Sequence, residues 1–121
     1  MPIEATSTQP TLESQGAILI DGDTGQILYQ KNAHTPFAPA SITKLMTALL
    51  TVENLAPNEE ITFSRNAVLS IERGSSHIGM REGEIITVEN ALHGLLLNSA
   101  NEVANGLAET ISGTIDEFAL K

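Results

Sequence analysis

The apolar pattern between Thr87 and Ile111 constrains the fold of this chain more than any other feature of its sequence. Apolar residues recur there on both sides of a polar break, Asn98-Ser-Ala-Asn101: Ala91, Leu92, Leu95 and Leu96 before it, and Val103, Ala104, Leu107, Ala108 and Ile111 after it. This spacing is typical of two amphipathic helices. Thr87 is a suitable N-cap for the first helix, and Gly113 is a suitable end for the second. The last third of the chain is therefore predicted to be helical.

The earlier part of the sequence adds strands and a third long helix. Residues 16–30 contain two short apolar runs around the turn-rich Asp21-Gly-Asp-Thr-Gly25, a pattern that predicts a β-hairpin. An apolar stripe at helical spacing predicts a helix from Ser41 to about Asn54. A short strand at 61–63 and a short helix at 64–70 are expected to follow. The fold class is therefore α+β.

Composition limits the size of the fold and the kinds of partner. A chain of 121 residues is at most one domain, and a hydrophobic content of 41% is ordinary for a globular protein. Aromatic residues make up only 3%, so we expect an aliphatic core. The formal net charge of −9 argues against a nucleic-acid partner. The chain has no cysteine, and His34, His77 and His93 lack ligand spacing, so neither a disulfide nor a metal site is expected.

A Ser-x-x-Lys motif stands at the start of the predicted helix at 41–54. Ser41 and Lys44 are three residues apart, a spacing that brings side chains together on a helix. A serine hydroxyl becomes a nucleophile when a base takes its proton, and a lysine must be uncharged to act as that base. We expect the helix N-terminus and burial to favour the neutral amine, because the side with Ile42, Leu45 and Met46 has the pattern of a core face. The alternative is a simple N-cap at Ser41, with Lys44 extending to solvent.

A second pair of polar residues, Ser99 and Asn101, lies in the break between the last two helices. Residues two apart share a face in an extended loop but not on a helix. A hydroxyl and a carboxamide together can relay a proton and hold a substrate amide. The alternative is a polar loop in which Ser99 or Asn101 caps the following helix.

Four stretches of the sequence together resemble one known family. They are Ala17-Ile-Leu-Ile-Asp with Gly25-Gln-Ile-Leu-Tyr29, Ala40-Ser-Ile-Thr-Lys44-Leu-Met-Thr, Gly74-Ser-Ser ahead of Arg81-Glu-Gly-Glu84, and Leu97-Asn-Ser-Ala-Asn101. In this order they resemble the serine D-alanyl-D-alanine carboxypeptidases, low-molecular-mass penicillin-binding proteins of the β-lactamase-like superfamily. The resemblance runs from about Gly16 to Lys121. Either polar motif alone is weak, whereas both in the family order are specific.

The resemblance implies a reaction and a role for each motif residue. Ser41 would be the acylated nucleophile, and Lys44 its general base. Ser99 would help to pass the proton to the leaving D-alanine, and Asn101 would orient the substrate and Lys44. The reaction implied is cleavage of the terminal D-Ala-D-Ala bond of peptidoglycan stem peptides through an acyl-enzyme, with β-lactams as inhibitors and without a metal or other cofactor. The location implied is extracytoplasmic, at the cell wall or the outer face of the cytoplasmic membrane.

The family's third motif, Lys-Thr-Gly, is absent from these residues. Lys31 is followed by Asn, Lys44 is followed by Leu, and Lys121 is the last residue. In the family this motif lies on a later strand and binds the substrate carboxylate, so the later sheet strands are expected to be missing as well. We therefore expect residues 16–121 to be the truncated N-terminal part of a transpeptidase-like catalytic domain, behind a flexible tail at 1–15.

Other interpretations remain open. A non-catalytic scaffold fragment could pair through an open sheet edge with a partner chain, either the missing C-terminal half or a second copy. A class A β-lactamase-like hydrolase is a further alternative, although Ala100 stands where the resemblance places Asp in those enzymes and often Gly in carboxypeptidases. Asp23-Thr-Gly25 resembles the motif of retroviral-type aspartic proteases, and Asp21-Gly-Asp23 the start of a calcium loop. Both are better interpreted as the turn of the predicted hairpin.

Overall fold

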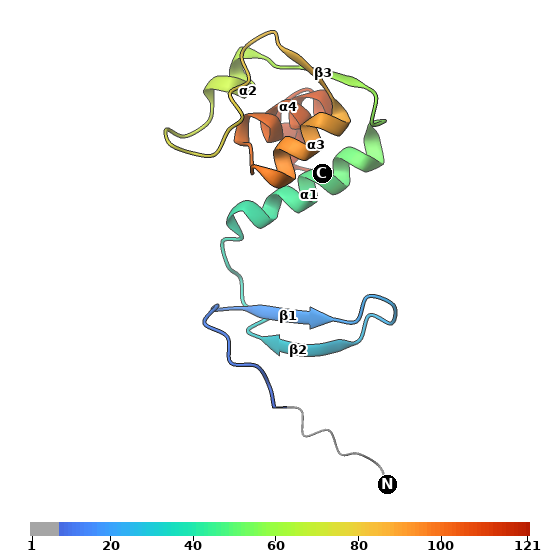
Figure 1. Cartoon of the computed structure of the whole chain (residues 1–121), viewed down its shortest axis with the longest axis vertical. Helices are drawn as coiled ribbons and strands as arrows, with labels where there is room; N and C mark the ends of the chain where they lie inside the picture. Colours follow the sequence, from blue (N-terminus) through green and yellow to red (C-terminus); the bar gives the residue numbers. More distant parts are fainter. Residues whose placement is uncertain (1–7) are drawn as a thin grey trace. The chain divides into compact units, whose positions relative to one another are not determined.

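The computed structural model of the protein describes residues 8–121, and the first seven residues of the predicted flexible tail lie outside the described residues. The chain divides into two compact units, Met1–Ala38 and Pro39–Lys121, and each is described by itself (Figure 1). None of the helices within residues 8–121 combines the length and the apolar character needed to span a bilayer.

The first unit is built on a β-hairpin, as the sequence predicted. Strand β1 (Ala17–Ile20) pairs antiparallel with β2 (Ile27–Lys31), and the register shifts once near the turn. Two backbone carbonyls ahead of β1 accept hydrogen bonds from the side chains of Lys31 and Asn32, at 2.7 and 2.8 Å. These contacts fasten the chain that precedes β1 to the end of β2.

The hairpin turn is organised by one carboxylate. Asp21 Oδ1 accepts hydrogen bonds from the backbone N–H of Thr24 at 2.8 Å, the Thr24 hydroxyl at 3.0 Å and the backbone N–H of Asp23 at 3.0 Å. These bonds, led by those from Thr24, lower the pKa of Asp21. Gly25 has φ +73°, in the left-handed region that glycine adopts without strain. The stretch is therefore a structural turn, as predicted.

The second unit is mainly helical. It contains η1 (Ala40–Ile42), α1 (Thr43–Asn54), β3 (Glu60–Thr62), α2 (Arg65–Leu69), β4 (Ile85–Thr87), α3 (Val88–Leu97), α4 (Asn101–Ser112) and α5 (Ile115–Ala119). Strands β3 and β4 pair antiparallel, with Ile61 opposite Ile86. Helix α4 is central, because it packs against α1, α2, α3, α5 and β3 (Figure 1). The predicted helices and the short strand are confirmed, with boundaries shifted by a residue or two.

The helix ends of this unit follow local sequence signals. The side-chain oxygens of Ser64, Thr87 and Thr114 each accept a hydrogen bond from the backbone N–H three residues later, at 3.0, 3.2 and 3.1 Å. Each residue therefore caps the helix that follows it. Helix α4 ends at Gly113, which has φ +82°. These caps explain why the predicted and observed boundaries agree.

Within residues 8–121, the buried hydrophobic core lies in the second unit. Its buried members are Ile61, Phe63, Ala67, Val88, Ala91, Leu95, Ala100, Val103 and Leu107. The expectation of a purely aliphatic core is wrong, because Phe63 is only 1% exposed. Its ring lies against Gly106 of α4, where an added Cβ would be 2.9 Å from the ring. The glycine therefore makes room for the aromatic side chain at the centre.

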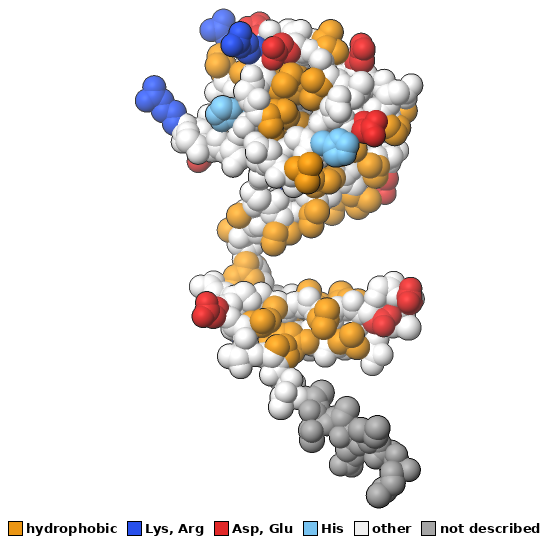
Figure 2. Space-filling model, in the orientation of Figure 1, with side chains coloured by type: hydrophobic (Ala, Val, Ile, Leu, Met, Phe, Trp, Pro, Cys, Tyr) orange, Lys and Arg blue, Asp and Glu red, His pale blue; other side chains and the backbone are white. Residues whose placement is uncertain are grey.

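The expectation that Ile42, Leu45 and Met46 form a buried face is also wrong for this unit. These side chains are 69%, 61% and 57% exposed, and hydrophobic side chains lie along the outside of α1 (Figure 2). Helices α3 and α4 pack against α1, and its buried residues are Thr47 and Thr51. The Thr51 hydroxyl donates to the Thr47 carbonyl at 2.7 Å, so its burial leaves no unpaired donor.

Candidate active site

Ser41 lies in the short 3-10 turn that leads into α1. The N-cap of that turn is Pro39, and no side chain caps it, so the interpretation of Ser41 as a simple N-cap is wrong. The preceding residue, Ala40, has φ +46°. A left-handed conformation in a residue other than glycine costs free energy and is found where surrounding contacts fix it, often at functional sites.

Three polar side chains converge at this point. Lys44 Nζ donates a hydrogen bond to Ser41 Oγ at 3.4 Å, and Ser99 Oγ donates to the same oxygen at 3.0 Å. Ser99 comes from the turn between α3 and α4 and has φ +54°. Lys44 is half-buried instead of extending freely to solvent. The contact that the i, i+3 spacing predicts is therefore present, and Ser99 adds a second hydroxyl to it.

The three side chains contribute to the lining of an open hollow of about 310 Å³. Its lining consists of Ser41, Ile42, Lys44, Leu45, Leu95, Leu96 and Ser99. The polar groups therefore share the hollow with four apolar side chains. Ser41 is exposed and Lys44 half-buried, so a substrate can reach the hydroxyl and the amine from solvent.

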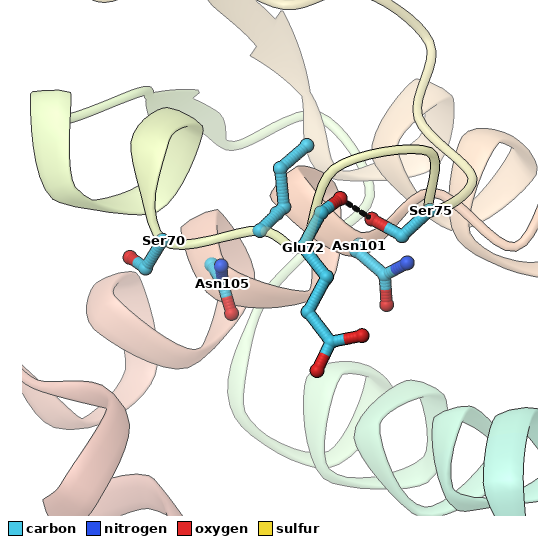
Figure 3. A pocket seen from close by; sticks show the side chains of 6 residues that line it. Ser70, Glu72, Ser75, Asn101 and Asn105 are labelled. Carbon is cyan, nitrogen blue, oxygen red and sulfur yellow. Dashed lines mark hydrogen bonds between the residues drawn. The ribbon is translucent and has the colours of Figure 1, made fainter.

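Asn101 lies in the adjoining region and makes different contacts. Its backbone N–H and its Nδ2 both donate to the Ser76 carbonyl, at 2.9 and 3.1 Å. It lines a second hollow of about 270 Å³ beside Glu72 and Ser75 (Figure 3). Helix α4 has Ala100 as its N-cap, without a side-chain hydrogen bond, so the interpretation of this loop as a capping loop is wrong. Within residues 8–121 Asn101 has no hydrogen bond to the lysine of the first motif, and its orienting role stays a prediction.

Two further residues beside this turn were not predicted from the sequence. Glu102 is 1% exposed, and its Oε1 accepts hydrogen bonds from the backbone N–H groups of Ile78 and Met80, at 2.7 and 3.3 Å. Asn98 Nδ2 donates to the His77 carbonyl at 3.0 Å. The available signal was the helical periodicity after the break, which places Glu102 beside the buried face of α4.

Comparison with known protein families matches residues 3–121 to the D-alanyl-D-alanine carboxypeptidases. The chain belongs to this family. The matched range includes Ser41, Lys44 and Ser99, the three residues that converge in the structure. It also confirms the family that the order of the sequence motifs indicated.

One curated relative and two solved structures agree with this assignment. DacF of Bacillus subtilis is 39% identical over 114 residues, which are 90% of this chain and 28% of that protein. The crystal structure of penicillin binding protein 6B from Escherichia coli is 32% identical, with a TM-score of 0.75 over 91% of this chain and 37% of that one. That of DacD from Francisella tularensis is also 32% identical, with a TM-score of 0.82 over 92% of this chain and 27% of that one. The α+β fold of penicillin-binding proteins is therefore confirmed, and the chain spans less than half the length of these relatives.

Proposed function

We propose that the protein is a serine D-Ala-D-Ala carboxypeptidase in which Ser41 is the nucleophile. One observation carries the proposal: the Ser41 hydroxyl oxygen lies 3.4 Å from the Lys44 amine and 3.0 Å from the Ser99 hydroxyl. A serine with a base and a second proton carrier in reach has the parts that acyl transfer requires. The family match supports the substrate class, a peptidoglycan stem peptide that ends in D-Ala-D-Ala.

The proposed acylation step uses these three groups in turn. Lys44, as the proposed general base, takes the proton of the Ser41 hydroxyl as Oγ attacks the carbonyl carbon of the penultimate D-alanine. The C–N bond to the terminal D-alanine then breaks, and the proton passes through the Ser99 hydroxyl to the leaving nitrogen. Water hydrolyses the resulting ester and restores the serine. Backbone N–H groups in the first turn of a helix have no partner within the helix, so the Ser41 N–H is suited to the developing oxyanion.

β-Lactams are proposed as inhibitors that acylate the same serine, and the proposed location is outside the cytoplasmic membrane, where peptidoglycan lies. Asn101 is proposed to orient the substrate peptide. No cofactor is invoked, because the serine, the amine and the second hydroxyl suffice for each step.

The outer face of α1 supports a further part of the proposal. Its exposed apolar side chains are Leu45, Met46, Leu49 and Val52, together with Ile42 at the N-cap of the helix. A monomer seldom exposes so many large apolar side chains along one helix. We propose that further chain covers this face in the complete catalytic domain, since the matched region is only 28% of the length of DacF. A second copy of the chain is the alternative occupant.

The function is tested by acylation of the full gene product with a fluorescent penicillin and by release of D-alanine from a D-Ala-D-Ala peptide. Ser41→Ala should abolish the label, and Lys44→Ala should slow acylation by about 10²–10⁴-fold. Lys31→Ala is the matched control, because Lys31 bonds a backbone carbonyl in the hairpin unit, and it should acylate at the parent rate.

Two outcomes of this test would contradict the proposal, and a third result would overturn a separate expectation about the 121 residues alone. A folded gene product that takes no label would favour the non-catalytic scaffold. Rapid hydrolysis of the bound penicillin would favour the β-lactamase-like alternative. We expect the 121 residues alone to release little D-alanine, because they contain no Lys-Thr-Gly motif to bind the substrate carboxylate, and robust release would overturn that expectation.

A further inference from the structure

Glu102 is the only buried carboxylate within residues 8–121. Its Oε1 accepts the backbone N–H groups of Ile78 and Met80, at 2.7 and 3.3 Å. Gly79, which lies between them, has φ +79°, a conformation that lets alternate N–H groups turn toward one acceptor. Glu102 also lies in the first turn of α4, where the helix dipole favours a negative charge. The carboxylate thus fastens residues 76–80, here named the bracing segment, to the start of α4.

Two other side chains bind the bracing segment, one on each side of Ser99. Asn98 Nδ2 donates to the His77 carbonyl at 3.0 Å. Asn101 donates to the Ser76 carbonyl from its backbone N–H at 2.9 Å and from its Nδ2 at 3.1 Å. Ser99, between these anchors, has φ +54°. A residue other than glycine keeps this conformation only where its surroundings fix it, and the bracing segment holds the chain on both sides of Ser99.

We propose that Glu102 is a positioning residue for the Ser99 hydroxyl, an inference that rests on the proposed function. Without the carboxylate, two backbone N–H groups of the bracing segment lose their acceptor and the segment can detach. Asn98 and Asn101 then lose the carbonyls to which they donate. Ser99 is free to leave the left-handed region and to carry its hydroxyl away from Ser41 Oγ, now 3.0 Å distant. Glu102 touches neither the substrate nor the reacting atoms, so its effect on the rate is indirect.

The test compares variants of the full gene product by two measurements. The first is the rate of acylation by a fluorescent penicillin, and the second is the NMR coupling between the amide and α protons of Ser99 together with its Cα shift, which report φ. Glu102→Ala should slow acylation on the order of 10²-fold, the effect of a misplacement of about 1 Å, and should move the Ser99 signals away from left-handed values. Glu102→Gln retains an oxygen at the Oε1 position and should restore most of the rate and of the signals.

Glu109→Ala is the matched control. Glu109 lies on the same helix and also accepts two hydrogen bonds, from Ser64 Oγ at 2.6 Å and Asn66 Nδ2 at 3.1 Å, but not from the bracing segment. Its loss should lower the melting temperature and leave acylation and the Ser99 signals unchanged. Asn98→Ala removes one exposed anchor, keeps the core intact and should slow acylation about tenfold, so it serves if Glu102→Ala does not fold.

Specific results would overturn the inference. One is a folded Glu102→Ala variant that acylates as fast as the unsubstituted protein. A second is an acylation rate in Glu109→Ala that falls as much as in Glu102→Ala. The third applies when Glu102→Ala does not fold, and it is an Asn98→Ala variant that acylates as fast as the unsubstituted protein. If the unsubstituted protein takes no penicillin, the proposed function fails. The NMR measurement then still decides the positioning, since Ser99 signals that do not move in the variants would overturn it and signals that move would support it.

Discussion

Replacing Ser99 with glycine should change stability and reactivity in opposite directions. At φ +54° a residue with a side chain carries a conformational cost of about 1–2 kcal/mol, which glycine does not. The greater freedom of glycine in the unfolded chain offsets roughly 0.5–1 kcal/mol of this gain. Ser99→Gly should therefore raise the free energy of unfolding by about 0–1.5 kcal/mol. It also removes the hydroxyl that donates to Ser41 Oγ at 3.0 Å, so acylation should slow by about 10²–10⁴-fold.

The assay pairs urea unfolding of the full gene product with its rate of acylation by a fluorescent penicillin. Ser99→Ala is the comparison variant, because it loses the same hydroxyl and keeps the strained backbone. It should acylate as slowly as Ser99→Gly and be the less stable of the two. If Ser99→Gly acylates as fast as the unsubstituted protein, the proposed passage of the proton through the Ser99 hydroxyl is refuted. A loss of stability in Ser99→Gly of more than about 1 kcal/mol would refute the argument from strain.

Three further predictions concern the fold. Gly106→Ala should lower the melting temperature, because the added methyl group would lie 2.9 Å from the Phe63 ring. The overpacking cost of about 1–3 kcal/mol exceeds the roughly 1 kcal/mol gained in helix propensity. A higher melting temperature would show that the ring moves freely. Ser64→Ala removes the cap of α2 and a hydrogen bond to the Glu109 carboxylate of α4. Urea unfolding should therefore show that the free energy of unfolding falls by about 1–2 kcal/mol. An unchanged urea midpoint would contradict the capping role of Ser64. Hydrogen bonds led by those from Thr24 hold the pKa of Asp21 below 3.8 in the folded turn, so their stabilisation is present above that pH and is lost as the pH falls through the folded value. An NMR titration of the Asp21 carboxyl should show a midpoint below pH 3.8. A midpoint at or above that pH would contradict the claim that these hydrogen bonds lower the pKa of Asp21.

Much of the secondary structure could be predicted because its signals are local. Ser64, Thr87 and Thr114 bond backbone groups only three residues away, and Gly113 ends α4 by its own conformation. The hairpin turn is fixed in the same way by Asp21. Such short-range contacts depend little on the rest of the fold, so the sequence around each residue suffices to predict them.

The buried face of α1 could not be predicted in the same way. Its apolar stripe indicated a core face, yet the residues of α1 that are buried are Thr47 and Thr51. Which face is buried depends on the elements that pack there, and α3 and α4 follow much later in the sequence. The same reason explains the central Phe63, whose place depends on the space left by Gly106.

The contacts of the candidate site that are local in sequence could likewise be predicted, and those between distant residues could not. The contact between Ser41 and Lys44 follows from helical spacing alone and was predicted. The approach of Ser99 to Ser41, over 58 residues of sequence, was implied only by the family resemblance. Helical periodicity places Glu102 beside the buried face of α4, but its partners, Ile78 and Met80, lie in a segment without regular structure. The pattern therefore did not indicate which groups would compensate a buried carboxylate, and Glu102 was missed.

The nucleophile itself is tested most directly by locating the covalent adduct. The full gene product is treated with penicillin, digested and mapped by mass spectrometry. The account predicts a single penicilloyl group, on the peptide that contains Ser41, and none in Lys44→Ala over the same time. An adduct on any other residue, or none on the folded protein, would contradict it.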